Sequence, residues 1–241
     1  MTIQTTEASP RFKARLAGVF ILIEGQASVF GQMVIPGQFI VARDAAATAA
    51  NILSNETLFQ LGVTLALISV AFHIAWVVLF YDLFKPVNRS FSLLAAFVGL
   101  IAIALQAVSA IFQIAPLKIL HGGEFSPAFT AEQLQALAYL SLHLKDQTFN
   151  MYLVFFGIWC LLTGYLIFIS GFMPRLVGQL EMLAGVAYLI LLWPPLASAW
   201  HPYYLFFGVG ELVLLLWLLV KGVDSERWHE RARALLKGEN S

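Results

Sequence analysis

Charged residues and cysteine are scarce in this chain. Charged residues make up 12% of its 241 residues, whereas a soluble domain carries about a quarter. The single cysteine, Cys160, excludes an intrachain disulfide framework and a cysteine-based metal site. The formal net charge is zero and no segment is strongly basic, so we expect no nucleic-acid partner.

Apolar residues are correspondingly abundant, at 60% of the chain. Crossing a hydrocarbon core takes about twenty helical residues, and six apolar stretches reach that length. The sequence therefore predicts an all-α fold, a six-transmembrane-helix bundle that contacts membrane lipids. The predicted spans are residues 15–35, 57–84, 91–117, 148–170, 175–198 and 202–221.

The distribution of Lys and Arg predicts the orientation of the bundle, because cytoplasmic loops carry an excess of these residues. Only Arg43, Lys118 and Lys145 fall on the predicted outer side. The other Lys and Arg residues lie at the span ends that fall on the cytoplasmic side when successive spans cross the membrane in alternate directions. Both termini are therefore expected in the cytoplasm. Glu24 interrupts the first apolar stretch and no clean cleavage site follows, so we expect this span to be retained rather than removed as a signal peptide. The cytoplasmic cations are Arg11, Lys13, Arg15, Lys85, Arg89, Arg175, Lys221, Arg227, Arg231, Arg233 and Lys237.

These boundaries divide the chain into a cytoplasmic tail (1–14), a membrane domain (15–223) and a second cytoplasmic tail (224–241). Short interfacial helices are expected outside. Asp44 is placed to cap a helix over 45–53, and Thr130 with Gln133 forms a capping box before a helix over 131–144. The second helix either covers an outer mouth or continues into the fourth span. The last tail predicts an amphipathic helix with Trp228 on its apolar side, resting on the inner leaflet.

Four Glu or His residues fall in the interior of the predicted spans, away from the span ends, and no Lys or Arg does. Helical rise places Glu24, His73, Glu181 and Glu211 about 9–18 Å from the nearest cytoplasmic cation. A charged side chain at the centre of a membrane helix costs roughly 2.5–3.5 kcal/mol. We therefore expect protonation, a bound cation or a water-filled cavity, with His73 as the only buried counter-charge.

Helical spacing gathers other polar residues onto shared faces. Glu24, Ser28 and Gln32 recur every four residues, and Gln106, Ser109 and Gln113 recur by three and four. Buried Gln and Ser can also serve only to join helices, at about 0.6 kcal/mol per contact. If the faces meet, the candidate ligand, ion or proton site comprises Glu24, Ser28, Gln32, His73, Gln106, Gln113, Glu181 and Glu211, with Asp146 and Asn150 at the outer mouth.

Enzymatic signatures are weak. A catalytic zinc site needs at least three convergent ligands, and His73 is the only histidine placed deep in a span. The sequence contains neither a G-x-S-x-G nucleophile elbow nor a Walker A loop. We predict no catalytic residues, metal or cofactor, and an enzyme is the least favoured of the functions considered.

Several segments together resemble the bacterial membrane-protein family catalogued as domain of unknown function 4386. The resemblance implies a six-span protein of the bacterial plasma (inner) membrane and supplies no catalytic residues. The segments are Ala14 to Gly18, Asp44 to Leu53, Lys85 to Arg89, Leu153 to Gly157, Gly164 to Phe168, Gly210 to Leu212 and Leu218 to Val223.

Two functions follow from these observations. The first is a transporter or channel for a small or lipophilic solute, with a polar, glutamate-lined centre. The alternative is a non-catalytic lipid-binding or accessory membrane subunit whose glutamates stay neutral. Assembly into a homo-oligomer is left open.

Overall fold

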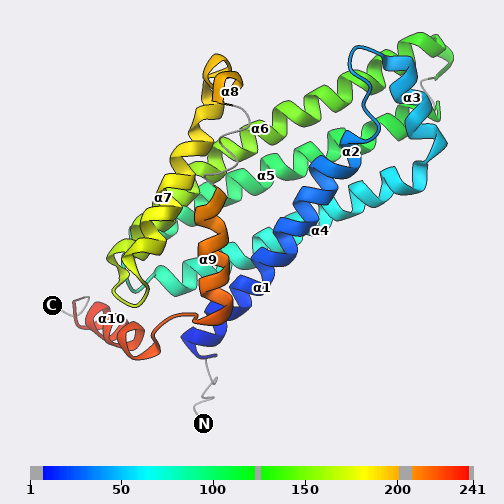
Figure 1. Ribbon diagram of the computed structural model, residues 1–241. Helices are drawn as coiled ribbons and strands as arrows, with labels where there is room; N and C mark the ends of the chain where they lie inside the picture. Colours follow the sequence, from blue (N-terminus) through cyan, green and yellow to red (C-terminus); the bar gives the residue numbers. More distant parts are fainter. Residues whose placement is uncertain (1–7, 123–125, 201–207, 239–241) are drawn as a thin grey trace. The chain divides into compact units, whose positions relative to one another are not determined.

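The computed structural model describes residues 8–122, 126–200 and 208–238 (Figure 1). These residues form helices joined by turns, and no β-strand occurs in these three ranges. The all-α prediction is confirmed.

The helices follow one another with short connections (Figure 1). Their bounds in chain order are α1 Pro10–Ser28, the π-helix η1 Val29–Val34, α2 Ile35–Gly37, α3 Ala45–Ser54, α4 Glu56–Phe84, α5 Arg89–Leu120, the 3₁₀ turn η2 Ser126–Ala128, α6 Ala131–Ser170, α7 Arg175–Leu189, the 3₁₀ turn η3 Ile190–Leu192, α8 Pro194–Trp200, α9 Val209–Val220 and α10 Ser225–Gly238.

Five helical stretches of the described residues are long and apolar enough to cross a membrane: Pro10–Gly37, α4, α5, α6 and Arg175–Leu192. The chain therefore has the character of a multi-pass membrane protein. The predicted sixth span, 202–221, includes residues 201–207, which lie outside the described residues. Its described part is α9, an apolar helix of 12 residues.

Both predicted helix caps are present. The Ala47 amide donates to Asp44 Oδ1 at 2.8 Å and begins α3. The Thr130 amide donates to Gln133 Oε1 at 2.8 Å, and the Gln133 amide donates to Thr130 Oγ1 at 3.3 Å. This capping box begins one continuous helix of 40 residues, α6. The prediction of a separate helix over 131–144 is therefore wrong, and the alternative, that this helix continues into the fourth span, is confirmed.

The predicted helix over 175–198 is interrupted instead. Helix α7 ends at Leu189, and α8 begins at Pro194. Pro194 and Pro195 have no amide hydrogen to continue the helical ladder, which accounts for a new start at this point.

The chain forms two compact units, which we describe separately. Unit 1 contains residues 1–22, 74–101 and 153–241, and unit 2 contains residues 23–73 and 102–152. Helices α1, α4, α5 and α6 contribute residues to both.

Unit 2 contains an irregular turn of the first apolar helix, η1, directly before Pro36. Pro36 has no amide hydrogen, so it cannot donate to the carbonyls of Gln32 and Gly31, four and five residues earlier. Side chains from other helices donate to both carbonyls: Gln113 Nε2 to Gly31 at 2.8 Å, and Lys145 Nζ to Gln32. The proline thus creates two acceptors that α5 and α6 satisfy.

Apolar side chains fill the remainder of this part of unit 2. The rings of Phe39 and Phe59 meet edge to face with centroids 5.3 Å apart. Ile52, Leu117 and Leu142 belong to the same buried cluster, so the residues around the proline are packed against α3, α4, α5 and α6.

Unit 1 is built around a close approach of α6 and α7. A Cβ atom built on Gly164 would lie 2.7 Å from the Gly178 carbonyl oxygen and 2.8 Å from the Met182 amide nitrogen. Gly157 faces Gly185 in the same way, with a hypothetical Cβ 2.9 Å from its oxygen. Glycine at these two positions of α6 therefore permits the close packing of α6 against α7.

Helix α10 is attached to unit 1 through Trp228. Its indole is buried, and Nε1 donates to the Leu83 carbonyl at 2.8 Å. The Asp224 amide donates to the Phe172 carbonyl at 3.1 Å just before this helix begins. Trp228 is therefore a core residue, and contact of α10 with the inner leaflet stays a prediction.

Substitution of Gly164 by Ala is expected to destabilise unit 1. The added methyl group meets backbone atoms of α7 that cannot rotate away, and overpacking of this kind costs about 1–3 kcal/mol. Gly25 is the matched control, because a Cβ there meets nothing within 4 Å. Thermal unfolding in detergent should show a lower Tm for Gly164→Ala and an unchanged or higher one for Gly25→Ala. Equal Tm values for the two variants would contradict the close packing.

Substitution of Lys145 by Met is expected to destabilise the protein by about 1–3 kcal/mol, because the buried Gln32 carbonyl loses its donor. Lys118→Met removes an exposed ammonium group and should change stability by less than about 0.5 kcal/mol. Denaturant unfolding in detergent measures both. A Lys145→Met variant as stable as Lys118→Met would show that this hydrogen bond does not stabilise the π-helical turn.

Candidate functional site

A polar cluster occupies the buried faces of three apolar helices in unit 2. Gln106 on α5 lies at its centre, and its Nε2 donates to Glu24 Oε1 and to Ser69 Oγ, both at 3.2 Å. Its Oε1 lies 2.9 Å from His73 Nδ1. With both amide hydrogens directed elsewhere, Oε1 is the acceptor, and Nδ1 of His73 must carry the proton that it donates.

Glu24 and His73 are the ionisable members of this cluster. Glu24 is 6% exposed and His73 is 0% exposed. Glu24 Oε1 lies 3.9 Å from His73 Nδ1, so the two groups are within electrostatic range while Gln106 bonds to both. The edge of the Tyr152 ring meets His73, with centroids 5.9 Å apart. The cluster is closed on this side by an aromatic ring from α6.

Local helix geometry explains why these four residues meet. Ser69 and His73 are one turn apart on α4, so they present one face. Glu24 is contributed by α1. The long, flexible side chain of Gln106 extends from α5 to donate to the Glu24 carboxyl group. A shorter Asn at 106 would not span acceptors on two helices at once.

A second polar group of unit 2 surrounds Gln32. Ser109 Oγ donates to Gln32 Oε1 at 3.2 Å or to the Lys145 carbonyl at 3.1 Å. Lys145 Nζ also lies 2.9 Å from Asp146 Oδ1 and over the Phe149 ring at 5.7 Å. Gln32 Nε2 is buried and has no hydrogen-bond partner among the described residues.

Lys145 is the residue that sequence reasoning missed. It was assigned to the outer side, beyond the predicted fourth span, yet it lies within α6 and is 3% exposed. The expectation that His73 is the only buried counter-charge is therefore wrong. Helical spacing could have indicated that Lys145 is buried. It stands four residues before Phe149 and seven before Tyr152, which places all three side chains on one face of a helix.

Unit 1 contains two acidic residues on adjacent helices. Glu181 on α7 is 1% exposed, and neither of its carboxyl oxygens has a hydrogen-bond partner among the described residues. Glu211 is on α9, which packs against α7, and its Oε1 is also buried without such a partner. The two carboxyl groups are close enough to interact electrostatically.

Two weakly polar side chains lie beside these acids. The buried Cys160 thiol is adjacent to Glu181, and the Tyr188 ring is adjacent to Glu211. Close approach of α9 to α7 requires Gly210, because any Cβ there would overlap the Leu180 carbonyl. The glycine next to Glu211 in the sequence thus holds the second carboxyl near the first.

Most of the predicted site residues therefore fall into three groups, two in unit 2 and one in unit 1. Unit 2 brings together Glu24, His73 and Gln106, and separately Gln32 with Lys145; Gln113 bonds Gly31, and Ser28 is buried. Asp146 bonds Lys145, whereas Asn150 is exposed. Glu181 and Glu211 belong to unit 1. In the described part of the chain, no group of three His, Cys, Asp or Glu residues could hold a metal ion.

Comparison with known proteins identifies the family without supplying an activity. A protein of Archaeoglobus fulgidus described as uncharacterized is 37% identical over 73 residues. That match covers 29% of this chain and 43% of the relative, so the chain spans less than half the length of this relative. No solved structure matches. The family model described as Domain of unknown function (DUF4386) matches residues 16–222, and the chain belongs to this family.

Proposed function

We propose that this protein is a transporter or channel that moves a small or lipophilic solute across a plasma membrane while buried glutamates exchange protons. In this proposal residues 202–221 form the sixth span, and both terminal tails are cytoplasmic. The excess of Lys and Arg at the ends assigned to that side supports the orientation.

The observation that carries the proposal is the carboxyl pair of unit 1. Glu181 is buried in an apolar helix beside a second carboxyl, and the donor next to it is the weakly polar Cys160 thiol. An ionised carboxylate in such a place is costly, so a proton or a cation must neutralise it. Glutamine would join helices without this cost. A carboxyl that must be neutralised is suited to take up and release a proton.

The cluster of unit 2 supports the same role. Glu24 and His73 are both able to hold a proton. Glu24 Oε1 lies 3.9 Å from His73 Nδ1, less than 1 Å beyond the length of a close salt bridge, which is about 3 Å. Movement of the Gln106 amide would bring carboxylate and imidazole together. The cluster therefore contains a proton donor and acceptor whose contact depends on one side chain.

A different observation favours the alternative, a non-catalytic binding or accessory protein. All the hydrogen-bonding atoms of the Gln106 amide have partners in the cluster. A saturated network of this kind holds helices in a fixed arrangement. Under this alternative the glutamates stay protonated at every physiological pH.

Glu181→Gln and Glu211→Gln are expected to abolish proton movement. Purified protein is reconstituted into liposomes that contain a pH-sensitive dye, a pH step is applied, and proton flux is recorded. We expect the wild-type flux to exceed that of protein-free liposomes, and each variant to lower it at least about tenfold because Gln carries no titrating proton. Glu132→Gln, an exposed site on α6, is the matched control and should retain the wild-type flux.

Infrared spectroscopy of the same samples distinguishes the two functions. In a proton-exchanging protein the carboxylic C=O band changes between about pH 5 and pH 9 and loses a component in Glu181→Gln. A wild-type band that is constant over this range, with a flux equal to that of protein-free liposomes, would overturn the proposal. Glu181→Asp should restore the band and part of the flux, which separates loss of titration from loss of folding.

A further inference from the structure

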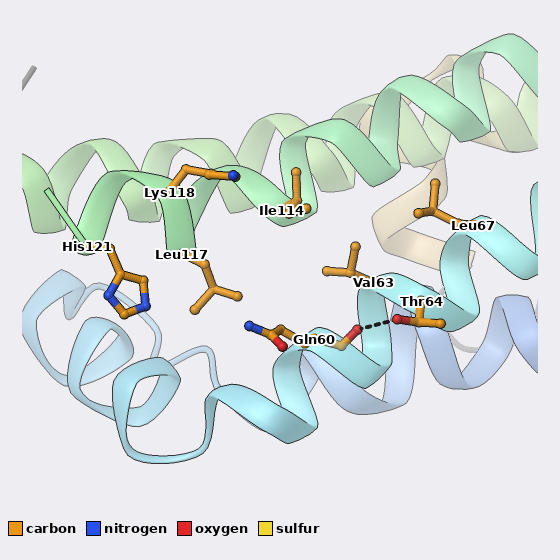
Figure 2. Close-up of a pocket in the computed structure, with 8 residues that line it drawn as sticks. All are labelled: Gln60, Val63, Thr64, Leu67, Ile114, Leu117, Lys118 and His121. Carbon is orange, nitrogen blue, oxygen red and sulfur yellow. Dashed lines mark hydrogen bonds between the residues drawn. The ribbon is translucent and has the colours of Figure 1, made fainter. Parts of the chain in front are cut away.

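An amphipathic groove lies between α4 and α5 in unit 2 (Figure 2). Its volume is about 580 Å³, which is in the range of small-molecule sites. Its lining residues are distinct from the members of the Glu24 cluster. The lining residues are Gln60, Val63, Thr64, Leu67, Ile114, Leu117, Lys118 and His121.

The groove has an apolar body and a polar end. Val63 and Leu117 are buried and form its floor, whereas Leu67 is 54% exposed and Ile114 is 38% exposed on its walls. Lys118 and His121 lie at the other end, and Gln60 lies between this end and Thr64, as Figure 2 shows. A ligand that fits must have a hydrocarbon part and a polar head.

The polar end coincides with the ends of the two helices. Lys118 is in the last turn of α5, and Gln60 is in the second turn of α4. The groove extends along α5 from Lys118 back to Ile114 and along α4 from Gln60 to Leu67. At about 1.5 Å of rise per residue, it reaches about 6–10 Å into the apolar segments of these helices. Residues at the ends of membrane helices lie at the depth of the lipid headgroups, so the apolar body lies at the depth of the acyl chains.

The charges at the polar end favour an anion. Glu56, in the first turn of α4, already accepts from His121 Nε2 at 3.1 Å. Among residues 8–122, 126–200 and 208–238, no acidic side chain forms an ion pair with Lys118. The Lys118 ammonium is therefore available to a phosphate oxygen, to which Lys binds as a point charge.

We propose that this groove binds an anionic phospholipid of the surrounding bilayer, with one acyl chain between α4 and α5 and the phosphate at Lys118. The exposed Leu67 and Ile114 walls let the chain enter sideways from the membrane. His121, held by Glu56, and Gln60 supply further donors to the headgroup. None of the lining residues belongs to the Glu24 cluster or to the carboxyl pair of unit 1, so this proposal does not depend on the proposed proton exchange.

The proposal is tested with the full chain in nanodiscs that contain equal amounts of phosphatidylglycerol and phosphatidylcholine. Native mass spectrometry after release measures how much of each lipid the protein retains. Wild type should retain phosphatidylglycerol preferentially. Lys118→Gln should lower this preference about fivefold, as expected for one Lys at a headgroup, and Ile114→Trp should displace the retained lipid by filling the groove.

Two matched controls make the outcome decisive. Arg43→Gln removes an exposed cation of unit 2 that does not line the groove, and Ile111→Trp adds the same indole one turn away on an exposed face of α5. Both should retain wild-type selectivity. Equal loss in Lys118→Gln and Arg43→Gln would show general attraction to an anionic surface, and unchanged lipid retention in Ile114→Trp would show that the groove is not the site. Either result overturns the proposal.

Discussion

Hydrocarbon offers no hydrogen bonds, so every polar group inside an apolar helix must find its partner within the protein. Unit 2 follows this constraint at the backbone around Pro36, while Gln32 Nε2 and Gln113 Oε1 lack a hydrogen-bond partner among the described residues. Pro36 removes a backbone donor, which leaves the carbonyls of Gly31 and Gln32 without a donor from their own helix. The side chains of Gln113 and Lys145 donate to these carbonyls instead. The buried ammonium of Lys145 is in turn held by Asp146 and the Phe149 ring. One proline therefore accounts for the π-helical turn and for a cation buried in α6.

In unit 1 the helices pack mainly through glycine and apolar side chains rather than through a polar network. Its glycine-lined interface between α6 and α7 brings backbones together without polar side chains, as is common between membrane helices. Against this apolar background both carboxyl oxygens of Glu181 and Oε1 of Glu211 lack a hydrogen-bond partner among the described residues, and the side chains beside the two acids are Cys160 and Tyr188. A network that is satisfied needs nothing further, whereas an unsatisfied carboxyl must hold a proton or a cation. This contrast is the physical reason to assign proton exchange to unit 1 before unit 2.

Local rules predicted much of the helical structure. The cap at Asp44 and the capping box at Thr130 depend on a few neighbouring residues, and each is present. The extent of α6 was harder to predict, because the polar residues Lys145 and Asp146 lower the local hydropathy without breaking a helix. Trp228 shows another limit of local rules, since an amphipathic pattern cannot distinguish a lipid-facing indole from one packed in a protein core, and this indole is packed in unit 1.

Sequence by itself determined the membrane character, the approximate ends of most helices and the identity of the costly buried acids, because hydropathy and charge act residue by residue. Tertiary structure decided the partners: Gln106 between Glu24 and His73, Lys145 at the Gln32 carbonyl, Glu181 beside Glu211. Such pairs join residues far apart along the chain, and helical periodicity fixes only the face on which a side chain lies. Which faces meet depends on packing among all the helices at once.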